Sequence, residues 1–419
     1  MRIALVDANN FYVSCERVFA PRLRDVPVVV LGNNDGIIVS RSPEAKAIGL
    51  KMGFPAFKAK DLMRTHRVRA LSSNYALYAA MSDRLMTVLA AFSPRIEKYS
   101  IDEAFLDLTD IGSETALEQA RRIKAVTKQW IGLPVCVGMG PTKTIAKLAN
   151  HVAKLMPEFD GVCDLTDPEI RRYWFDGIDA AEVWGVGPAA AEKLARLGYR
   201  SVASLREMPS RLARDLLTVA GERIVHELNG IACVKVETAS PARQGTAVTR
   251  NFGHPITSFE QIREAVASYA TRVAEKLREQ NQEAEILSVF MHTNRYSGDP
   301  WYGNAKKIKL SAPSADTLTL VRVVVDAARE IWKDGYRYSK AGVIADKLVT
   351  AGDGQRSLFE PAKASRDRLM KAMDQVNARM GRGTLAPLGA GIRPTWKTRF
   401  GRRSPDYLTN WQDLPIARS

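Results

Sequence analysis

The sequence is poor in the residues that build disulfide-rich or zinc-bound folds. Its 419 residues include only four cysteines, which lie far apart and form no C-x-x-C pair. The cysteines are Cys15, Cys136, Cys163 and Cys233. The five histidines are scattered in the same way. Neither a disulfide framework nor a zinc site is indicated.

Long apolar runs are also missing. The first run, Ile3 to Val6, ends after four residues at Asp7. No later run approaches the roughly 20 residues that a membrane-spanning helix needs. We therefore expect no signal peptide, no membrane partner and a cytoplasmic location.

Charge is present in excess of one sign. There are 61 Lys and Arg residues against 46 Asp and Glu, so the net charge is 61 − 46 = +15. A charge of this size favours an anionic partner, and nucleic acid is the commonest one for a soluble basic protein. Composition alone leaves a well-solvated basic enzyme as an equally good interpretation. At about 150 residues per domain, the length predicts about three domains.

The first 165 residues predict a mixed α/β domain built on a sheet. Apolar runs and alternating patterns indicate strands, and apolar residues at helical spacing indicate helices. The expected strands cover residues 3–7, 26–31 and 135–138 and the flanks of 96–108. The expected helices cover residues 10–18, 75–92, 114–130 and 142–153.

The remainder divides into three parts. Residues 167–232 look all-helical, and the polar stretch that follows predicts a linker. Residues 246–349 then give strand, helix, strand, strand, helix, strand, which is the ferredoxin-like βαββαβ order. From Asp353 the last 67 residues hold 13 Lys and Arg and 6 Asp and Glu, a net charge of 13 − 6 = +7. We expect a tethered basic tail, partly folded around Trp396 and Trp411.

Three carboxylates stand out in the α/β domain. Asp7 closes a buried strand, where a helix N-cap would explain it alone. Asp102 and Glu103 interrupt an apolar strand pattern and would repel one another unless a cation neutralises them. Neighbours on a regular strand point to opposite faces, so both reach one metal only at a hairpin bend or a distorted strand. A solvent-facing hairpin tip is the competing interpretation. The combination of all three favours Mg²⁺, in a two-ion site for in-line displacement.

Four ordered segments resemble the Y-family DNA polymerases of the UmuC type. They are Asp7 to Glu16 (DANNFYVSCE), Ser100 to Ala104 (SIDEA), Val137 to Lys147 (VGMGPTKTIAK) and Val183 to Gly187 (VWGVG). The resemblance covers essentially the whole chain. It implies an α/β (α+β) multidomain fold in the form of a right-hand polymerase. The implied domains are a palm at 1–165 with small fingers at about 20–75, a helix-hairpin-helix thumb at 166–235, a linker at 236–245, a ferredoxin-like little finger at 246–350, and a clamp-binding peptide with the basic tail at 351–419.

The resemblance also assigns the catalytic site. Asp7, Asp102 and Glu103, helped by the backbone carbonyl of Ala8, would hold two Mg²⁺ ions. Phe11 and Tyr12 would lie against the incoming nucleotide, with Tyr12 beneath its sugar as a steric gate. An aromatic ring packed against C2′ leaves no room for a ribose hydroxyl. The alternative is that both are core aromatics of the first helix.

Phosphate and DNA contacts follow from the same resemblance. Ser40, Lys46 and Lys154 would bind the triphosphate of the nucleotide. The sequence departs from many relatives at Pro43 and Lys46, where a tyrosine and an arginine are usual. Lys46 supplies charge without the bidentate fork of arginine, and the loss of the tyrosine leaves nucleotide affinity open.

The DNA contacts expected in the first 235 residues are Lys143, Lys147, Gly185, Gly187 and Lys193. A solvated lysine face would give the same spacing for the lysines, and a plain helix end would explain Gly187. By the resemblance, basic residues on or beside the strands of the ferredoxin-like domain would lie along the DNA groove: Arg250, Lys306, Lys307, Lys309, Lys340 and Lys347. The alternative is that most of them are ordinary surface residues.

Gln355, Leu358 and Phe359 resemble the bacterial sliding-clamp peptide, which docks two apolar residues in a pocket. The expected partners are primer–template DNA, deoxynucleotides, a UmuD′-like dimer, the sliding clamp and RecA. The resemblance implies error-prone synthesis past template lesions in the SOS response and association with the nucleoid. Two other functions remain open from the residues: a nuclease using the same carboxylates, and a non-catalytic DNA-binding or clamp-associated subunit.

Overall fold

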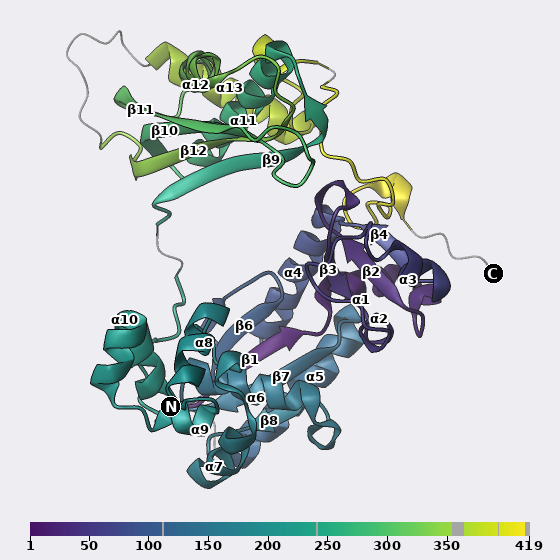
Figure 1. The fold of residues 1–419 in the computed structure, drawn as a ribbon, viewed down its shortest axis with the longest axis vertical. Coiled ribbons are helices and arrows are strands. Elements are labelled where there is room, and N and C mark those ends of the chain that lie inside the picture. Colours follow the sequence, from purple (N-terminus) through teal and green to yellow (C-terminus); the bar gives the residue numbers. More distant parts are fainter. Residues whose placement is uncertain (111–112, 240–241, 354–363, 393, 415–419) are drawn as a thin grey trace. The chain divides into compact units, whose positions relative to one another are not determined.

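The computed structural model describes residues 1–110, 113–239, 242–353, 364–392 and 394–414. Its contacts divide the chain into two compact units (Figure 1). The first unit contains Met1–Gly32, Gly36–Ser240 and Arg402–Ser419, and the second contains Asn33–Asp35 and Pro241–Gly401. Apart from Asn33–Asp35, the chain passes from the first unit to the second after Ser240 and returns to the first at Arg402.

A five-stranded sheet forms the centre of the first unit, in the order β5-β6-β1-β7-β8. The strands are β1 (Ile3–Ala8), β5 (Ile96–Lys98), β6 (Glu103–Asp107), β7 (Val135–Gly140) and β8 (Val162–Asp164). The central strand β1 is buried along its whole length and runs antiparallel to β6 and β7. Burial on both faces explains why its sequence is an apolar run that ends in a single carboxylate.

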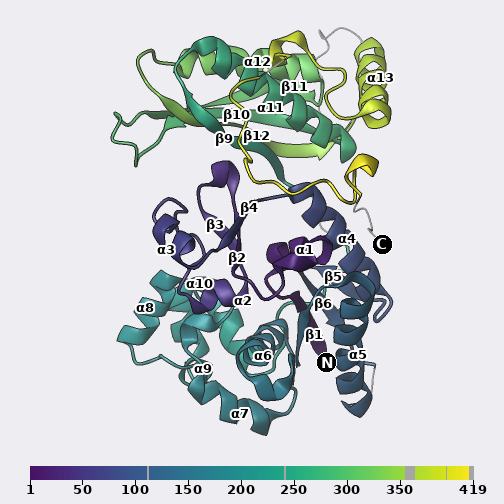
Figure 2. The ribbon, with the colours of Figure 1, turned by 90° about the vertical axis from the view of Figure 1, so that its right-hand side faces the viewer.

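Helices cover both faces of this sheet (Figure 2). The helices α1 (Phe11–Phe19), α4 (Tyr75–Ala90) and α5 (Ser113–Ile131) pack on one face, where Ala4 and Val6 point. The helix α6 (Lys143–Leu155) packs on the other, against Leu5 and Phe105. A Cβ on Gly138 would lie 2.1 Å from the backbone nitrogen of Asn150, so only glycine lets α6 lie this close to β7.

A smaller sheet, in the order β3-β2-β4, completes the α/β part of the first unit. It consists of β2 (Val28–Leu31), β3 (Ile38–Arg41) and β4 (Arg69–Ser72), with the short helices α2 (Pro43–Ala47) and α3 (Lys60–Thr65). Val29, Leu31 and Ile38 form a separate small core with residues of the connecting segments. The sequence had indicated only the first of these three strands.

The all-helical prediction for residues 167–232 is confirmed. Four helices occupy this part: α7 (Pro168–Gly177), α8 (Pro188–Arg196), α9 (Val202–Arg206) and α10 (Ser210–Leu228). Pro188 is the first residue of α8, where its missing N–H costs nothing. Gly185 has a φ of +94°, a conformation that other residues rarely adopt.

The second unit has the predicted βαββαβ order. Its elements are β9 (Gly245–Ile256), α11 (Phe259–Glu279), β10 (Gln282–Thr293), β11 (Gly303–Ser314), α12 (Thr317–Ile331) and β12 (Tyr338–Thr350). The strands form one antiparallel sheet in the order β11-β10-β12-β9. Each helical crossover therefore spans one intervening strand, and both helices pack on one face over a shared core.

The C-terminal part is more ordered than a tethered tail. The helix α13 (Ala364–Met380) is held on the second unit by Asp374, whose carboxylate accepts two hydrogen bonds of 2.7 Å from Arg278. Trp396 is 4% exposed in the core of that unit, as predicted. The expectation for Trp411 is wrong, because its ring is 88% exposed. Residues 402–414 pack on the first unit.

The described residues also contain six short 3-10 helices: η1 (Pro21–Leu23), η2 (Asn33–Asp35), η3 (Pro157–Phe159), η4 (Ala180–Glu182), η5 (Leu388–Ala390) and η6 (Trp411–Asp413). Across the described ranges, no helix has both the length and the apolar character needed to cross a membrane. The clamp-like residues Gln355, Leu358 and Phe359 lie outside the described residues.

Candidate active site at the end of the central strand

The three predicted carboxylates all lie near the end of β1. Asp7 lies opposite Glu103 in the antiparallel register of β1 and β6. The backbone N–H of Ala8 donates to the carbonyl of Asp102 over 3.0 Å. Asp102 itself lies in the turn between β5 and β6, where its Oδ1 accepts a 2.6 Å hydrogen bond from Ser100. This is the hairpin bend that two adjacent carboxylates need to face one site.

Two lysines of α6 form ion pairs with two of these carboxylates. Lys154 Nζ is 2.7 Å from Asp7 Oδ1, and Lys147 Nζ is 3.1 Å from Glu103 Oε2. Burial raises the pKa of Asp7 to about 7, and the adjacent Glu103 adds to the rise while Lys154 opposes it. In the described part of the chain, no group of three or more His, Cys, Asp or Glu side chains is arranged for a metal ion. The cluster nevertheless has oxygen donors and excess negative charge, which fit a hard divalent cation.

Lys143 does not share this arrangement. Its side chain is 1% exposed, and its ammonium pairs with Glu97 at 2.5 Å. This burial argues against the DNA contact expected for it, because a phosphate could reach it only by displacing Glu97. Lys193 is exposed on α8, and Gly187 is the N-cap of that helix.

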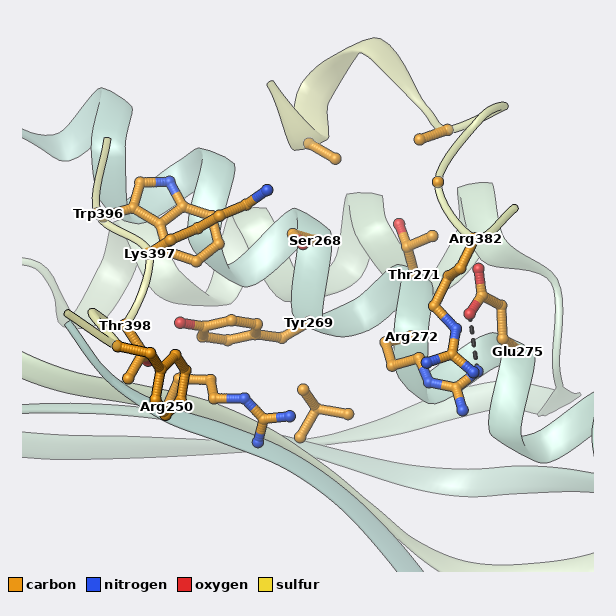
Figure 3. A pocket seen from close by; sticks show the side chains of 15 residues that line it. Arg250, Ser268, Tyr269, Thr271, Arg272, Glu275, Arg382, Trp396, Lys397 and Thr398 are labelled. Atoms are coloured by element: carbon orange, nitrogen blue, oxygen red, sulfur yellow. Dashed lines mark hydrogen bonds and ion pairs between the residues drawn. The ribbon is translucent and has the colours of Figure 1, made fainter. Parts of the chain in front are cut away.

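A pocket of about 410 Å³ lies in the second unit (Figure 3). Arg250, expected on the DNA groove, lines it together with Tyr269 of α11 and Trp396.

The basic residues of the second unit lie on both faces of its sheet. Val248 and Phe252, two positions either side of Arg250, point into the core, so Arg250 lies on the helical face of the sheet. Lys306 pairs with Glu330 of α12 on that same face. Lys307 and Lys309 are exposed on the opposite face, as strand alternation requires.

A second pocket, of about 360 Å³, lies in the first unit and has Asp102 in its lining. Five of the predicted site residues line it: Phe11, Tyr12, Ser40, Lys46 and Asp102. Burial lowers the pKa of Lys46, as do the neighbouring charges of Arg41 and Lys154, whereas Asp7 raises it. The pocket thus combines an acidic edge with a basic one.

The sequence did not single out Arg41, which also lines this pocket. Arg41 ends β3, and its guanidinium donates to the carbonyl of Leu50. Ser40 is its neighbour, and the Ser40 hydroxyl donates to the carbonyl of Asn10 over 3.4 Å. The run Ser40-Arg41-Ser42 places a cation beside a predicted residue, which is the only local signal that could have pointed to Arg41.

The two aromatic residues of α1 differ in environment. Phe11 is 3% exposed and belongs to the core, so the core interpretation holds for most of this ring. Tyr12 is half-buried and stacks on Tyr78 of α4, with ring centroids 4.4 Å apart and planes 13° from parallel. The hydroxyl of Tyr78 donates to Glu16 over 2.7 Å. Neither Tyr78 nor Glu16 was predicted to have a role at the site.

Family models match most of the chain. Residues 6–151 match the impB/mucB/samB family, and residues 243–358 match the C-terminal domain of that family. Residues 367–417 match a domain of unknown function. Similar proteins include ImpB of Salmonella typhimurium, at 40% identity over 99% of both chains. UmuC of Salmonella typhimurium strain LT2 is 41% identical over 98% of this chain and 99% of its own.

More distant relatives and similar solved structures include DNA polymerases. DNA polymerase IV of Pelotomaculum thermopropionicum is 28% identical over 90% of this chain and 92% of its own. The structure of a Y-family DNA polymerase chimera of Dbh matches with a TM-score of 0.68 and 23% identity. The structural match covers 83% of this chain and 99% of the chimera. DinB of Sulfolobus solfataricus matches with a TM-score of 0.53. The chain belongs to the impB/mucB/samB family, together with the UmuC proteins, and has the fold of the Y-family DNA polymerases.

Proposed function

We propose that the chain is a DNA-directed DNA polymerase that copies damaged template, with its active site at the end of β1. One observation carries the proposal: Asp102 lines a pocket together with Tyr12, Ser40 and Lys46. Asp7, which lies opposite Glu103, is close enough to raise the pKa of Lys46 in that pocket. A nucleotide triphosphate has an aromatic base, a sugar and a polyanion. The pocket offers it a ring, a hydroxyl and cations in one place.

Asp7, Asp102 and Glu103, with the carbonyl of Ala8, would hold two Mg²⁺ ions. Bound there, the ions would favour the ionised primer hydroxyl and stabilise charge on the leaving pyrophosphate. The high pKa of Asp7 supports this assignment, since a buried carboxylate next to another one gains most from a bound cation. Lys147 and Lys154 balance the same charge in the metal-free protein.

The cations beside the pocket would bind the triphosphate. Lys154 is 37% exposed at its side chain and can exchange Asp7 for a phosphate oxygen. Lys46 and Arg41 add positive charge from the other side, and Ser40 offers a hydroxyl. The exchange keeps Lys154 paired throughout, so no ammonium is left without a partner.

Tyr12 would select the sugar. Its ring lines the nucleotide pocket and is supported from behind by the stacked ring of Tyr78. A supported ring cannot move away from a 2′-hydroxyl without breaking this stack. Discrimination against ribonucleotides is then a steric effect of one side chain.

The remaining parts would hold the DNA. In this assignment, residues 1–165 are the palm with fingers at about 20–75, residues 166–235 the thumb, and residues 246–350 the little finger. Gly185, Gly187 and Lys193 would contact the phosphate backbone, with Lys147 near the primer terminus. Lys307, Lys309 and Lys340 would add sequence-independent contacts, which suits a polymerase that must accept any template.

The UmuC-like relatives suggest the partners: a UmuD′-like dimer, RecA and the sliding clamp, the last through Gln355, Leu358 and Phe359. Structural neighbours include an insertion ternary complex of Dbh DNA polymerase. We accordingly propose primer–template DNA and a deoxynucleotide as the substrates of this chain.

Primer extension tests the proposal. With Mg²⁺, four deoxynucleotides and a template containing an abasic site, the wild-type chain with its UmuD′-like partner and clamp should extend the primer. Asp102→Ala should reduce extension by at least about 100-fold, because it removes a direct metal ligand. Equal activity of the two proteins would refute the metal assignment. Shortening of an end-labelled primer without nucleotides would favour a nuclease, and DNA binding without extension would favour a non-catalytic subunit.

A further inference from the structure

Residues 402–408, which we call the C-terminal segment, pack on the first unit beside the end of β4 and the start of α4 (Figure 2). The backbone N–H of Ser72, at the end of β4, donates to the carbonyl of Arg402 over 3.0 Å. The N–H of Arg402 in turn donates to the hydroxyl of Ser72 over 2.8 Å. Further along, the ring of Tyr407 stacks on Phe19 of α1 at 5.0 Å. The segment belongs to the domain of unknown function.

Asn74 joins the segment to the start of α4. Its side-chain amide lies 3.0 Å from the hydroxyl of Ser404 and 3.1 Å from the carbonyl of Pro405. Its Oδ1 accepts from the backbone N–H of Leu77 over 3.3 Å and so caps the helix. The residue that begins α4 is thus bonded to the segment by the same side chain that caps the helix.

Ser404 reaches a buried carboxylate on α1. Glu16 is 1% exposed, and its Oε1 accepts hydrogen bonds from Tyr78, over 2.7 Å, and from Ser404, over 3.1 Å. Burial raises the pKa of Glu16, while the bonds from Tyr78 and Ser404 lower it. A carboxylate this deeply buried needs its donors, because an unpaired charge in a protein interior is costly.

The contacts continue from Glu16 to the nucleotide pocket. Tyr78 is fully buried, so its ring is fixed by packing and its hydroxyl by Glu16. That ring stacks on Tyr12, which lines the pocket. The sequence of contacts from Ser404 to Glu16, Tyr78 and Tyr12 therefore links the C-terminal segment to the ring that would face the nucleotide sugar.

We propose that Ser404 is a positioning residue for sugar selection, which acts through Glu16 and Tyr78 to hold the ring of Tyr12 in place. The proposal rests on the proposed role of Tyr12 as the steric gate. It gives part of the domain of unknown function a role: the C-terminal segment completes the support of the nucleotide pocket. Removal of the Ser404 hydroxyl leaves Glu16 with one donor fewer and lets the two stacked rings shift.

The test is single-nucleotide primer extension by the full-length protein, with kcat and KM measured separately for a ribonucleotide and the matching deoxynucleotide. Ser404→Ala and Tyr78→Phe each remove one hydroxyl and keep the surrounding side chains. Both should raise the ratio of kcat/KM for the ribonucleotide to that for the deoxynucleotide by about 2- to 10-fold, the effect of one hydrogen bond. Thr409→Ala, which shortens an exposed residue just beyond the segment, is the matched control and should leave the ratio unchanged.

The ratios measured for the variants decide whether Ser404 positions the ring of Tyr12. An unchanged ratio in both variants overturns the proposal, and so does a loss of activity that affects the two nucleotides equally. Tyr12→Ala distinguishes failure of the gate role of Tyr12 from failure of the positioning role of Ser404. If it leaves the ratio unchanged, the gate role itself fails. If it raises the ratio while Ser404→Ala and Tyr78→Phe do not, only the positioning role fails. Should Ser404→Ala fold poorly, Ser404→Gly, which also removes the hydroxyl, takes its place beside Tyr78→Phe.

Discussion

Burial of Asp7 favours its neutral form, whereas the proposed metal-binding role requires the ionised carboxylate. Its position at the end of a buried strand removes water from the carboxylate, and Glu103 faces it across the sheet. The pKa of Asp7 therefore rises from its ordinary value of 3.8 to about 7 in the metal-free protein. Lys154 offsets only part of this cost. A cation bound there would relieve the repulsion between Asp7 and Glu103 and favour the ionised form of Asp7.

This raised pKa predicts a pH-dependent effect of Asp7→Asn on stability. The folded state holds the Asp7 proton more tightly than the unfolded chain does, so stability is lost as the pH rises from about 4 to 7. The amide that replaces the carboxylate carries no charge at any pH. In EDTA, the melting temperature of the Asp7→Asn variant relative to wild type should therefore increase between pH 5 and pH 8. A difference that is constant with pH would contradict the assignment. Mg²⁺ at pH 8 should stabilise the wild type more than the variant.

At the scale of elements, the positions of the lysines on α6 depend on how closely this helix packs against β7. It supplies both Lys147 and Lys154, so its distance from the sheet sets where the two ammonium groups reach. Gly138 permits that distance, since a side chain there would meet the backbone of the helix at Asn150 and Ala146. Backbone atoms cannot rotate away as a flexible side chain would.

Gly138→Ala should therefore lower the free energy of unfolding by about 3 kcal/mol or more, at the upper end of the range for overpacking. Gly177→Ala is the matched control, because a Cβ at the end of α7 meets nothing within 4 Å. Urea denaturation monitored by circular dichroism measures both. Similar losses for the two variants would show that the close approach of α6 is not what Gly138 provides.

At the scale of the whole molecule, the chain enters the second unit after Ser240 and returns to the first at Arg402. Residues 364–401 stabilise the second unit, where Arg278 binds Asp374 and Trp396 fills the core. Residues 402–414 stabilise the first, where Asn74 and Glu16 bind Ser404. One continuous C-terminal stretch therefore serves both units.

Truncation after Gly401 should expose this division of roles. Hydrogen exchange of the truncated protein should increase at the start of α4, around Asn74 to Tyr78, because the bonds to Ser404 and Pro405 are gone. Exchange in α11 and β10 should stay as in the full-length protein, since their contacts lie before the truncation. Faster exchange throughout both units would contradict two separate roles.

Local pattern was sufficient for much of the fold. The apolar run at Ile3 to Val6, the helical spacing of residues 75–92 and the βαββαβ order of the second unit all appear in the structure as predicted. These features depend on neighbours within a few positions, which is why they can be read along the chain. A bend at Asp102 and Glu103 was a condition of the metal interpretation, and the structure has a hairpin between β5 and β6 there.

Contacts between residues far apart in the sequence could not be predicted from local patterns. The spacing of Lys143 and Lys147 is the same whether a lysine faces DNA or Glu97, and packing alone buried the first of them. The strand order β11-β10-β12-β9 is one of several that fit the same element order. Ser404 and Glu16 are 388 positions apart, and no periodicity links residues at that separation. Their hydrogen bond exists because the chain returns to its first unit, where burial leaves Glu16 in need of a donor.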